Sequence, residues 1–269
     1  MPMLPSFDIA AASVIGREHA RAGRNNQDAF SLLAQGEVLA AVVADGCGSG
    51  AHSEVGAQLG ARCVAQAVLA VAGEGLSVEA PEFLEAVRSR VLKFLSSLTE
   101  QLGGSLVGEH LLFTVVGAAV TPTRTLVFSA GDGLWALNGE VHPLGPFPNN
   151  APPYLAYGLL SSGAVPLERQ ALVPTDEVMA LMLGTDGAAD LAKLTEARVP
   201  ERDEPVGPLS QYWTDERYFQ NPDALRRRLT LLGRESVRAD FTAHRLVRTP
   251  SLLADDTTLI VLRRRMGRA

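Results

Sequence analysis

VLAAVVADGCGSG, residues 38–50, decides how this sequence folds, because an unbroken apolar run ends abruptly at an Asp-Gly pair. A short run rich in valine and bounded by turn residues is typical of a buried β-strand. A carboxylate beside such a strand is costly to bury unless something positive meets it. Asp45 and Gly46 therefore mark either a simple turn or a binding site, and the rest of the chain has to distinguish the two.

The same pattern recurs at three more places along the chain. In each, an apolar run adjoins one or two aspartates, and no lysine or arginine is adjacent except in the run after the last strand. One Asp-Gly pair is most often simple turn chemistry. Four such segments are better explained by a shared cation site. The further positions are Asp132 in FSAGDGL, Asp186 in LMLGTDG, and Asp255 with Asp256 in LLADDTTLIVL.

The ligand types in these segments indicate magnesium or manganese. Both cations prefer hard oxygen ligands, and magnesium in particular takes one or two carboxylates while keeping several waters. The five histidines show no paired spacing of the kind that zinc sites use. The sequence therefore predicts Mg²⁺ or Mn²⁺ rather than Zn²⁺.

Local patterns predict an α+β fold. Apolar stripes at helical spacing cover 55–71 and 83–102, and a third helix is expected over 222–232. Ser53 and Asn221 are cap candidates for the first and third helices, and Pro81 suits the first turn of the second. Hairpin links at 121–124 and at Asn138-Gly139 predict antiparallel pairing, so a layered α+β fold is favoured over a parallel α/β sheet. The expected strands are 38–44, 111–121, 125–130, 134–137, 140–143, 178–183 and 257–262.

Composition excludes several classes of function. Hydrophobic residues make up 46% of the 269 residues, enough for a sizeable core, and the formal net charge of −6 argues against a protein that covers nucleic acid. Two cysteines in different surroundings indicate no disulfide framework and favour a reducing cytoplasm. The N-terminal residues lack the pattern of a signal peptide, and apolar runs such as 111–120 are too short to span a bilayer. We expect no nucleic acid partner and no membrane association.

Two stretches, 145–163 and 198–211, are rich in proline and polar residues and predict loops. Long loops beside a site are often functional, so 145–163 is a candidate flap. We expect a single domain over 1–269, with an inserted region of loops and a helix at about 191–250.

The ordered series of motifs resembles the metal-dependent protein phosphatases of the type 2C class, also called PPM, in a bacterial-style form. The similarity covers residues from about 7 to 265, nearly the whole chain. Each motif alone is weak, and the order and the strand context make the set specific. The motifs are Asn26-Gln27-Asp28, Asp45-Gly46, Gly131-Asp132, Thr185-Asp186-Gly187 and Asp255-Asp256-Thr257-Thr258.

The resemblance implies a four-layer α-β-β-α sandwich of two antiparallel sheets flanked by helices, with a site for two Mn²⁺ or Mg²⁺ ions and a possible third. It assigns Asp45 as the bridging ligand, with Asp186 and Asp255 completing the shell of the first ion. The carbonyl of Gly46 would bind the second ion, and Asp28 would hold its waters. Asp132 would form the weaker third site, for which Asp186 is a further candidate ligand, and Asp190 would support the ligands from outside.

The chain departs from the family pattern at two positions. Many members carry an arginine that grips the substrate phosphate five positions before the equivalent of Asp28, where this sequence has Gly23. Arg24 is the candidate phosphate-binding residue in its place, and Arg17, His19 and Arg21 lie upstream. Many eukaryotic members also have a histidine after the Asp-Gly pair, thought to protonate the leaving group. Here that residue is Cys47, a poor general acid, so we expect water to fill the role.

These observations predict a serine/threonine protein phosphatase in which a metal-bridging hydroxide attacks the phosphomonoester, with Asp45, Asp186 and Asp255 as the catalytic set. Its expected partners are a phosphorylated protein substrate and a cognate kinase. Two alternatives stay open. The chain is either a catalytically weak or inactive regulator that binds phosphoproteins, or a phosphatase that acts on a small metabolite.

Overall fold

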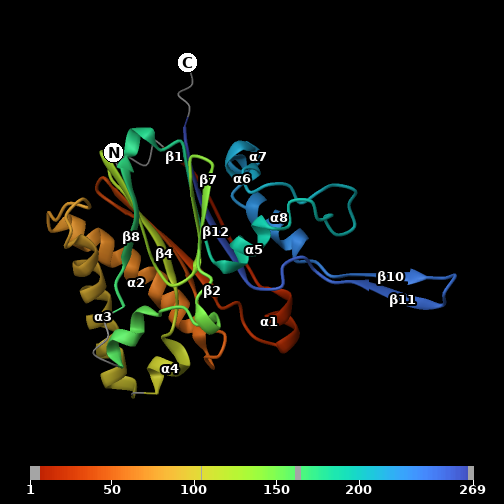
Figure 1. Cartoon of the computed structure of the whole chain (residues 1–269), viewed down its shortest axis with the longest axis horizontal. Helices are drawn as coiled ribbons and strands as arrows, with labels where there is room; N and C mark the ends of the chain where they lie inside the picture. The colour runs from red at the N-terminus through yellow and green to blue at the C-terminus, as the bar shows by residue number, and fades with distance from the viewer. Residues whose placement is uncertain (1–6, 104, 161–164, 266–269) are drawn as a thin grey trace.

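The computed structural model describes residues 7–103, 105–160 and 165–265, and these form two stacked antiparallel sheets with helices on both outer faces (Figure 1). This arrangement confirms the predicted four-layer α-β-β-α sandwich. Three apolar cores hold the layers together, one between the sheets and one beneath each helical layer.

The first sheet has the strand order β2-β3-β4-β5-β8. Neighbouring strands are antiparallel throughout, and Asp28 at the start of β2 lies directly opposite Asp45 at the end of β3. The register therefore places two carboxylates side by side at one end of the sheet. The strands are β2 (Asp28–Gln35), β3 (Val38–Asp45), β4 (Val115–Val120), β5 (Arg124–Ala130) and β8 (Glu168–Pro174).

The second sheet has the order β1-β12-β9-β6-β7 and joins the two ends of the chain, because β1 pairs with β12 along its whole length. Its strands are β1 (Phe7–Val14), β6 (Gly133–Leu137), β7 (Glu140–Leu144), β9 (Ala180–Gly184) and β12 (Thr257–Arg264). The strands β6, β9 and β12 all carry a predicted aspartate just beyond one end, which brings Asp132, Asp186 and Asp255 to the same edge of the sandwich.

The burial of β3 shows why two helical layers are needed. Ala40, Val42 and Ala44 face the helices, while Leu39 and the alternate residues after it face the other sheet. A strand buried on both faces reads as a continuous apolar run, which is the pattern of the opening segment. The helices that cover the first sheet are α2 (Ser53–Gly73), α3 (Phe83–Leu102) and α4 (Leu106–His110).

The second sheet is covered by shorter helices, most of them from the predicted inserted region. These helices are α5 (Asp186–Ala192), α6 (Gln211–Thr214), α7 (Arg217–Gln220) and α8 (Ala224–Leu232). A hairpin of β10 (Ser236–Asp240) and β11 (Arg245–Thr249) follows α8 and projects away from the body (Figure 1). The sequence patterns predicted the helix in this region but not the hairpin.

Several predicted boundaries were wrong. Ser53 is the first helical residue of α2 rather than its cap, and its hydroxyl is buried without a hydrogen-bond partner. Helix α8 begins at Ala224 after Asp223, whose N–H donates to the side chain of Asn221. The strand expected over 111–121 is regular only from Val115, because the preceding residues make an isolated bridge to Gly46 instead of continuing the ladder with β3.

The flap candidate contains two short 3-10 helices, Pro148–Asn150 and Leu155–Leu159, and its residues 161–163 lie outside the described part of the chain. Helix α1 (Arg17–Ala22) and the strands β1, β2 and β8 were not predicted at all.

One helix, α2, is long and apolar enough to cross a membrane by length and composition, although polar residues interrupt its apolar sequence. More than half of its most apolar window is buried inside the protein, against the first sheet and α3. Packing against two elements is the arrangement of a core helix in a folded domain.

Candidate metal centre

The predicted aspartates meet in one pocket of about 260 Å³ at the end of the sandwich opposite the start of β1. Asp45, Gly46, Asp132, Asp186 and Asp255 all line it, although they are spread over 211 positions of the sequence. The structure thus brings together five of the predicted site residues. The whole lining consists of His19, Gln27, Asp45, Gly46, Cys47, Gly48, Ser49, Asp132, Pro152, Tyr154, Asp186 and Asp255.

Two of the Asp-Gly pairs are not simple turns. Neither Gly46 nor Gly187 has a positive φ, so backbone conformation does not require glycine there. A Cβ at Gly46 would lie 2.5 Å from the carbonyl oxygen of Ser53, and one at Gly187 would lie 2.0 Å from that of Asp256. Glycine is required because other segments approach closely. The pairs are therefore packing contacts that hold the carboxylates together.

The electrostatics of the pocket match a cluster of carboxylates. Burial, followed by repulsion from Asp28, Asp186, Asp255 and Asp132, raises the pKa of Asp45 well above its ordinary value. Burial and the neighbouring carboxylates likewise raise the pKa of Asp186 to about 7. The pKa values of Asp132 and Asp255 are also raised, with burial as the largest cause in each. Without a counter-charge, these groups therefore keep their protons to a higher pH than ordinary aspartates do.

The donor set fits a divalent cation of the magnesium or manganese type. One carboxylate oxygen of Asp132 and one of Asp28 are buried without a hydrogen-bond partner, and such atoms are costly unless a ligand meets them. Oxygen atoms from several carboxylates are the ligands these cations take. Among these residues, Asp45, Asp132, Asp186 and Asp255 would hold cations directly.

Asp28 lies behind the pocket rather than in its wall. One of its oxygens accepts a hydrogen bond from the hydroxyl of Thr185 at 2.6 Å. Burial, with repulsion from Asp256 and Asp186 among the further causes, raises its pKa well above the ordinary value. Because Asp28 lies opposite Asp45, it is placed to bind waters on a cation rather than the cation itself.

The two adjacent aspartates at the start of β12 have different surroundings. Asp256 is almost fully buried, and its oxygens accept hydrogen bonds from the backbone N–H groups of Gly16 at 2.6 Å and Gln27 at 2.5 Å. The side chain of Asp255 is half exposed and lines the pocket. Asp256 therefore fastens the two ends of the segment 16–27 to the body, and this segment carries α1.

His19 on α1 is not among the predicted site residues, and the structure places it in the pocket wall. Its Nδ1 lies 2.9 Å from Asp256 and 3.7 Å from Asp255, so these three side chains also form a group that could hold a metal ion. Asp256 already accepts two backbone hydrogen bonds, so its main task is to hold the chain. No local pattern marks this residue, because its partner Asp256 comes from the other end of the chain.

We predict opposite consequences for removing these neighbours in metal-free protein. Asp256→Ala leaves two buried N–H groups without acceptors, so the free energy of unfolding should fall by about 2–5 kcal/mol. Asp255→Ala removes a carboxylate from a repelling cluster and should leave stability unchanged or higher. Urea unfolding in the presence of a chelator measures both. Equal losses in the two variants would contradict the separate roles.

The predicted phosphate-binding residue lies at the rim. Arg24 is exposed, and its guanidinium donates a hydrogen bond to the carbonyl oxygen of Gly48, which lines the pocket. The guanidinium of Arg17 donates to the carbonyl of Ser251 at 2.8 Å, and that of Arg21 pairs with Glu235 at 2.9 Å. Asp190 also stays outside the lining, where it pairs with Lys193 at 2.8 Å.

The position after Gly46 places a thiol in the pocket. The Cys47 sulfur lies 3.1 Å from the hydroxyl of Ser49. Burial would raise the pKa of this thiol, but hydrogen bonds with Ser49 and with Tyr154 lower it overall. Tyr154 comes from the flap candidate and was not predicted as a site residue. Its presence shows that this loop closes one side of the pocket.

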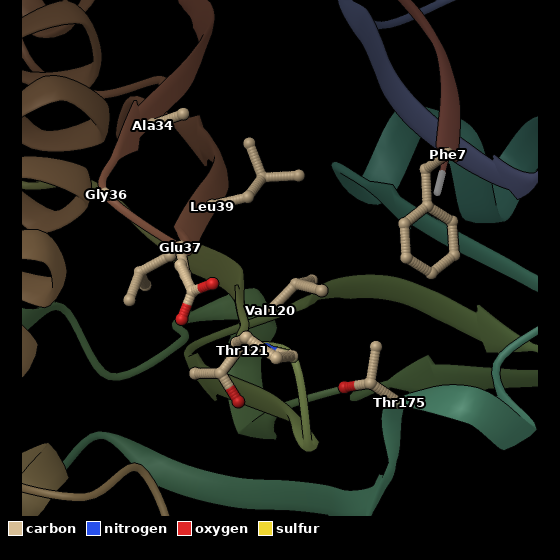
Figure 2. Close-up of a pocket in the computed structure, with 10 residues that line it drawn as sticks. Phe7, Ala34, Gly36, Glu37, Leu39, Val120, Thr121 and Thr175 are labelled. Atoms are coloured by element: carbon tan, nitrogen blue, oxygen red, sulfur yellow. The ribbon is translucent and has the colours of Figure 1, made fainter. Parts of the chain in front are cut away.

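A second pocket lies at the other end of the sandwich and lacks this chemistry. Figure 2 shows Leu39 and Val120 on one sheet facing the ring of Phe7 on the other. Its cavity of about 20 Å³ is large enough for about one water molecule, and Glu37 is the one ionisable side chain among its lining residues. The carboxylate cluster is thus confined to one end.

The comparisons with known proteins agree with this geometry. Serine/threonine phosphatase Stp1 from Staphylococcus aureus has a similar structure, with a TM-score of 0.55 and 14% identity over 98% of this chain and 97% of that one. Serine-threonine phosphatase 2C from Toxoplasma gondii matches with a TM-score of 0.57 and 16% identity over 97% and 96% of the two chains.

The catalytic domain of the protein phosphatase PstP, solved in complex with two manganese ions, matches with a TM-score of 0.50 and 17% identity over 96% and 98%. At these identities the likeness establishes the fold. No curated protein sequence is significantly similar to the chain.

The sequence itself gives the family assignment. Residues 15–229 match the family described as protein phosphatase 2C. This range contains the motifs from Gln27-Asp28 to Asp186-Gly187. The last motif, Asp255-Asp256-Thr257-Thr258, lies beyond the range and leads into β12. The resemblance predicted from those motifs is confirmed, and the chain belongs to the protein phosphatase 2C family.

Proposed function

We propose that this protein hydrolyses phosphoserine and phosphothreonine esters in proteins, with two Mn²⁺ or Mg²⁺ ions in the pocket of aspartates. The observation that carries the proposal is the convergence of Asp45, Asp132, Asp186 and Asp255 around a single pocket. Their raised pKa values and the partnerless oxygen of Asp132 fit a site built to receive positive charge.

The residues would divide the work by position. Asp45 would hold both ions, Asp186 and Asp255 would hold the first, and the Gly46 carbonyl would hold the second. When bound, the ions supply a nucleophilic water of lowered pKa and neutralise charge on the phosphate during in-line attack. Asp28 would orient waters from behind, and Asp132 would hold a weaker third ion.

No histidine follows the Asp45-Gly46 pair to protonate the leaving oxygen of the substrate. Cys47 occupies that position, and its sulfur is already engaged by the hydroxyl of Ser49 at 3.1 Å. We therefore assign protonation of the leaving oxygen to water. His19, which stands on the α1 side of the pocket, helps to hold the wall through its contact with Asp256.

We also propose a cytoplasmic setting in which a protein kinase adds the phosphate that this enzyme removes. Both cysteines are free, which suits a reducing compartment.

The test of the function is hydrolysis of an aryl phosphate and of phosphoserine, phosphothreonine and phosphotyrosine peptides, each with manganese and with a chelator. We expect manganese-dependent turnover of the aryl phosphate and of the first two peptides. Turnover of small phosphorylated metabolites with no turnover of peptides would favour the metabolite phosphatase. Manganese binding with no turnover of any substrate would favour the inactive regulator.

Arg24 gives a prediction about phosphate recognition. If its guanidinium turns from the Gly48 carbonyl to the substrate phosphate, Arg24→Ala should lower kcat/KM by roughly 30-fold to 1000-fold, the loss of about 2–4 kcal/mol in a charge-assisted contact. Kinetics on a phosphoserine peptide measure this. Arg21→Ala is the control, because Arg21 is paired with Glu235. Unchanged kinetics for Arg24→Ala would remove the assignment.

A further inference from the structure

The hairpin of β10 and β11, residues 236–249, is the part of the described chain that projects farthest from the body (Figure 1), and we call it the arm. Its register pairs Val237 with Arg248, Arg238 with Val247, and Ala239 with Leu246. Nothing in the proposed chemistry at the pocket uses these residues.

The arm exposes four large apolar side chains. Phe241 is 85% exposed, Leu246 66%, Val237 51% and Val247 40%. Single exposed apolar residues are common on protein surfaces, but a group on one projecting element marks an interaction surface. The arm therefore has the composition of an interface.

The charge of the arm is opposite to that of the chain. It carries three arginines, Arg238, Arg245 and Arg248, and one aspartate, Asp240, in a protein of net charge −6. Arg245 is 3.7 Å from Asp240 and Arg248 is 3.8 Å from Glu235, which are loose pairs. Arg238 makes no ion pair within the described part of the chain. These guanidinium groups are available to an acidic partner.

The two faces of the arm differ. Residues that pair across antiparallel strands share a face, and successive residues alternate between faces. Val237, Ala239 and Leu246 consequently lie on one face, together with Arg248, whereas Arg238 and Arg245 lie on the other with Val247 and Asp240. One face is mainly apolar and the other mainly polar and charged.

The arm also has open edges. Two-stranded ribbons are only marginally stable in water, and a third strand is usually needed. Over 237–248, backbone groups make no hydrogen bond to another element of the described structure. An extended segment can therefore pair with either edge, as peptides do when they add a strand to a sheet.

The base of the arm joins the wall of the pocket. Glu235, just before β10, pairs with Arg21 of α1 at 2.9 Å, and Ser251, just after β11, accepts a hydrogen bond from Arg17 of α1. The same helix carries His19 into the pocket lining. A polypeptide held on the arm would thus reach the phosphatase site without crossing to another face.

We propose that the arm docks the protein substrate through an extended segment in which acidic and apolar residues alternate. This inference rests on the proposed phosphatase function. A strand added to the edge of β10 would place its apolar side chains beside Val237 and Ala239 and a carboxylate beside Arg238. On the edge of β11 the corresponding neighbours are Leu246 and Arg245. The docking segment lies outside the phosphorylated residue, and the pocket itself binds the phosphate.

Three synthetic peptides test the proposal. Each carries the same phosphoserine segment, which has no other charged side chain, and a flexible glycine-serine linker. In the first peptide an alternating Glu-Val segment follows the linker, and in the second the matching Lys-Val segment follows it. The third peptide ends at the linker. For the wild type we expect a KM for the Glu-Val peptide about five to ten times lower than for the other two, with similar kcat. Fluorescence anisotropy of dye-labelled Glu-Val peptide measures binding independently of turnover.

The variant Arg238→Glu/Arg245→Glu should abolish the advantage of the Glu-Val peptide while leaving aryl phosphate hydrolysis unchanged. Leu246→Ser should weaken peptide binding in the same assay. The matched control is Arg62→Glu/Lys93→Glu, which makes the same charge change at exposed positions of α2 and α3 and should keep the wild-type preference. Circular dichroism checks the folding of all variants.

Three outcomes would overturn the docking role. The first is that all three peptides have the same KM and bind equally well. The second is that the control variant also loses the preference for the Glu-Val peptide. The third is that light scattering shows the wild type to be a dimer and the arm variant to be a monomer. The last would assign the arm to a second copy of the chain. Absence of aryl phosphate hydrolysis would instead defeat the proposed function, and the anisotropy measurement would still decide whether the arm binds the acidic segment.

Discussion

Asp45→Asn should reduce manganese-dependent hydrolysis of an aryl phosphate by roughly a thousandfold or more. Asp45 lies at the end of β3, and the four other aspartates of the site all act on its carboxylate electrostatically. In the proposed arrangement it is the ligand shared by both ions, and no neighbouring side chain can take its place. An amide keeps the shape but lacks the charge that holds two cations.

The measurement is steady-state kinetics at saturating manganese, with folding checked by circular dichroism. Asp190→Asn is a suitable control, because Asp190 lies outside the pocket and pairs with Lys193 at the surface. It should keep most of the wild-type activity. A folded, metal-saturated Asp45→Asn protein that retained a tenth of the wild-type turnover would exclude the two-metal proposal.

Manganese should raise the melting temperature of the wild type by about 5–11 °C. A ligand that binds only the folded state at about a hundred times its dissociation constant adds roughly 2.7 kcal/mol, and each kcal/mol shifts the midpoint of a domain of this size by about 2–4 °C. A chelator should reverse the rise. Asp186→Asn should gain less from manganese and should be at least as stable as the wild type without it.

The pH dependence of the stability of the metal-free protein is a second test of the same site. The folded state raises the pKa of Asp186 from 3.8 to about 7, so between these values it binds a proton that the unfolded chain has lost. Stability of the metal-free wild type should therefore fall as pH rises from about 4 to about 7, and less steeply in Asp186→Asn. If neither manganese nor pH changed the melting temperature of the wild type, the aspartates would not share a site.

The sequence by itself determined the interior of the fold. Strands β3, β5, β6, β9 and β12 are apolar runs bounded by turn residues, and helices α2 and α3 carry regular apolar stripes. These patterns are local, because an element buried on one or both faces needs apolar residues at regular positions of its own sequence. The aspartates at the strand ends were visible for the same reason, since a carboxylate beside a buried run is conspicuous.

The missed strands are those whose pairing depends on distant partners. β2 and β8 are edge strands of the first sheet, with exposed or partly exposed residues along much of their length. β1 is rich in alanine and pairs with β12 from the other end of the chain. The arm exposes most of its residues. Such segments have weak periodicity, because neighbouring strands rather than their own composition fix their conformation.

The tertiary structure alone decided which acidic residues face the pocket. Asp255 and Asp256 are adjacent in sequence, yet only Asp255 lines the pocket. Asp256 is buried and accepts hydrogen bonds from the backbone N–H groups of Gly16 and Gln27, which are 240 and 229 positions away. Asp190 and Asp186 share a helix, but Asp190 points to Lys193 at the surface. The composition of a motif names the carboxylates, but only the packing of segments distant in sequence determines whether each meets a cation, a backbone donor or water.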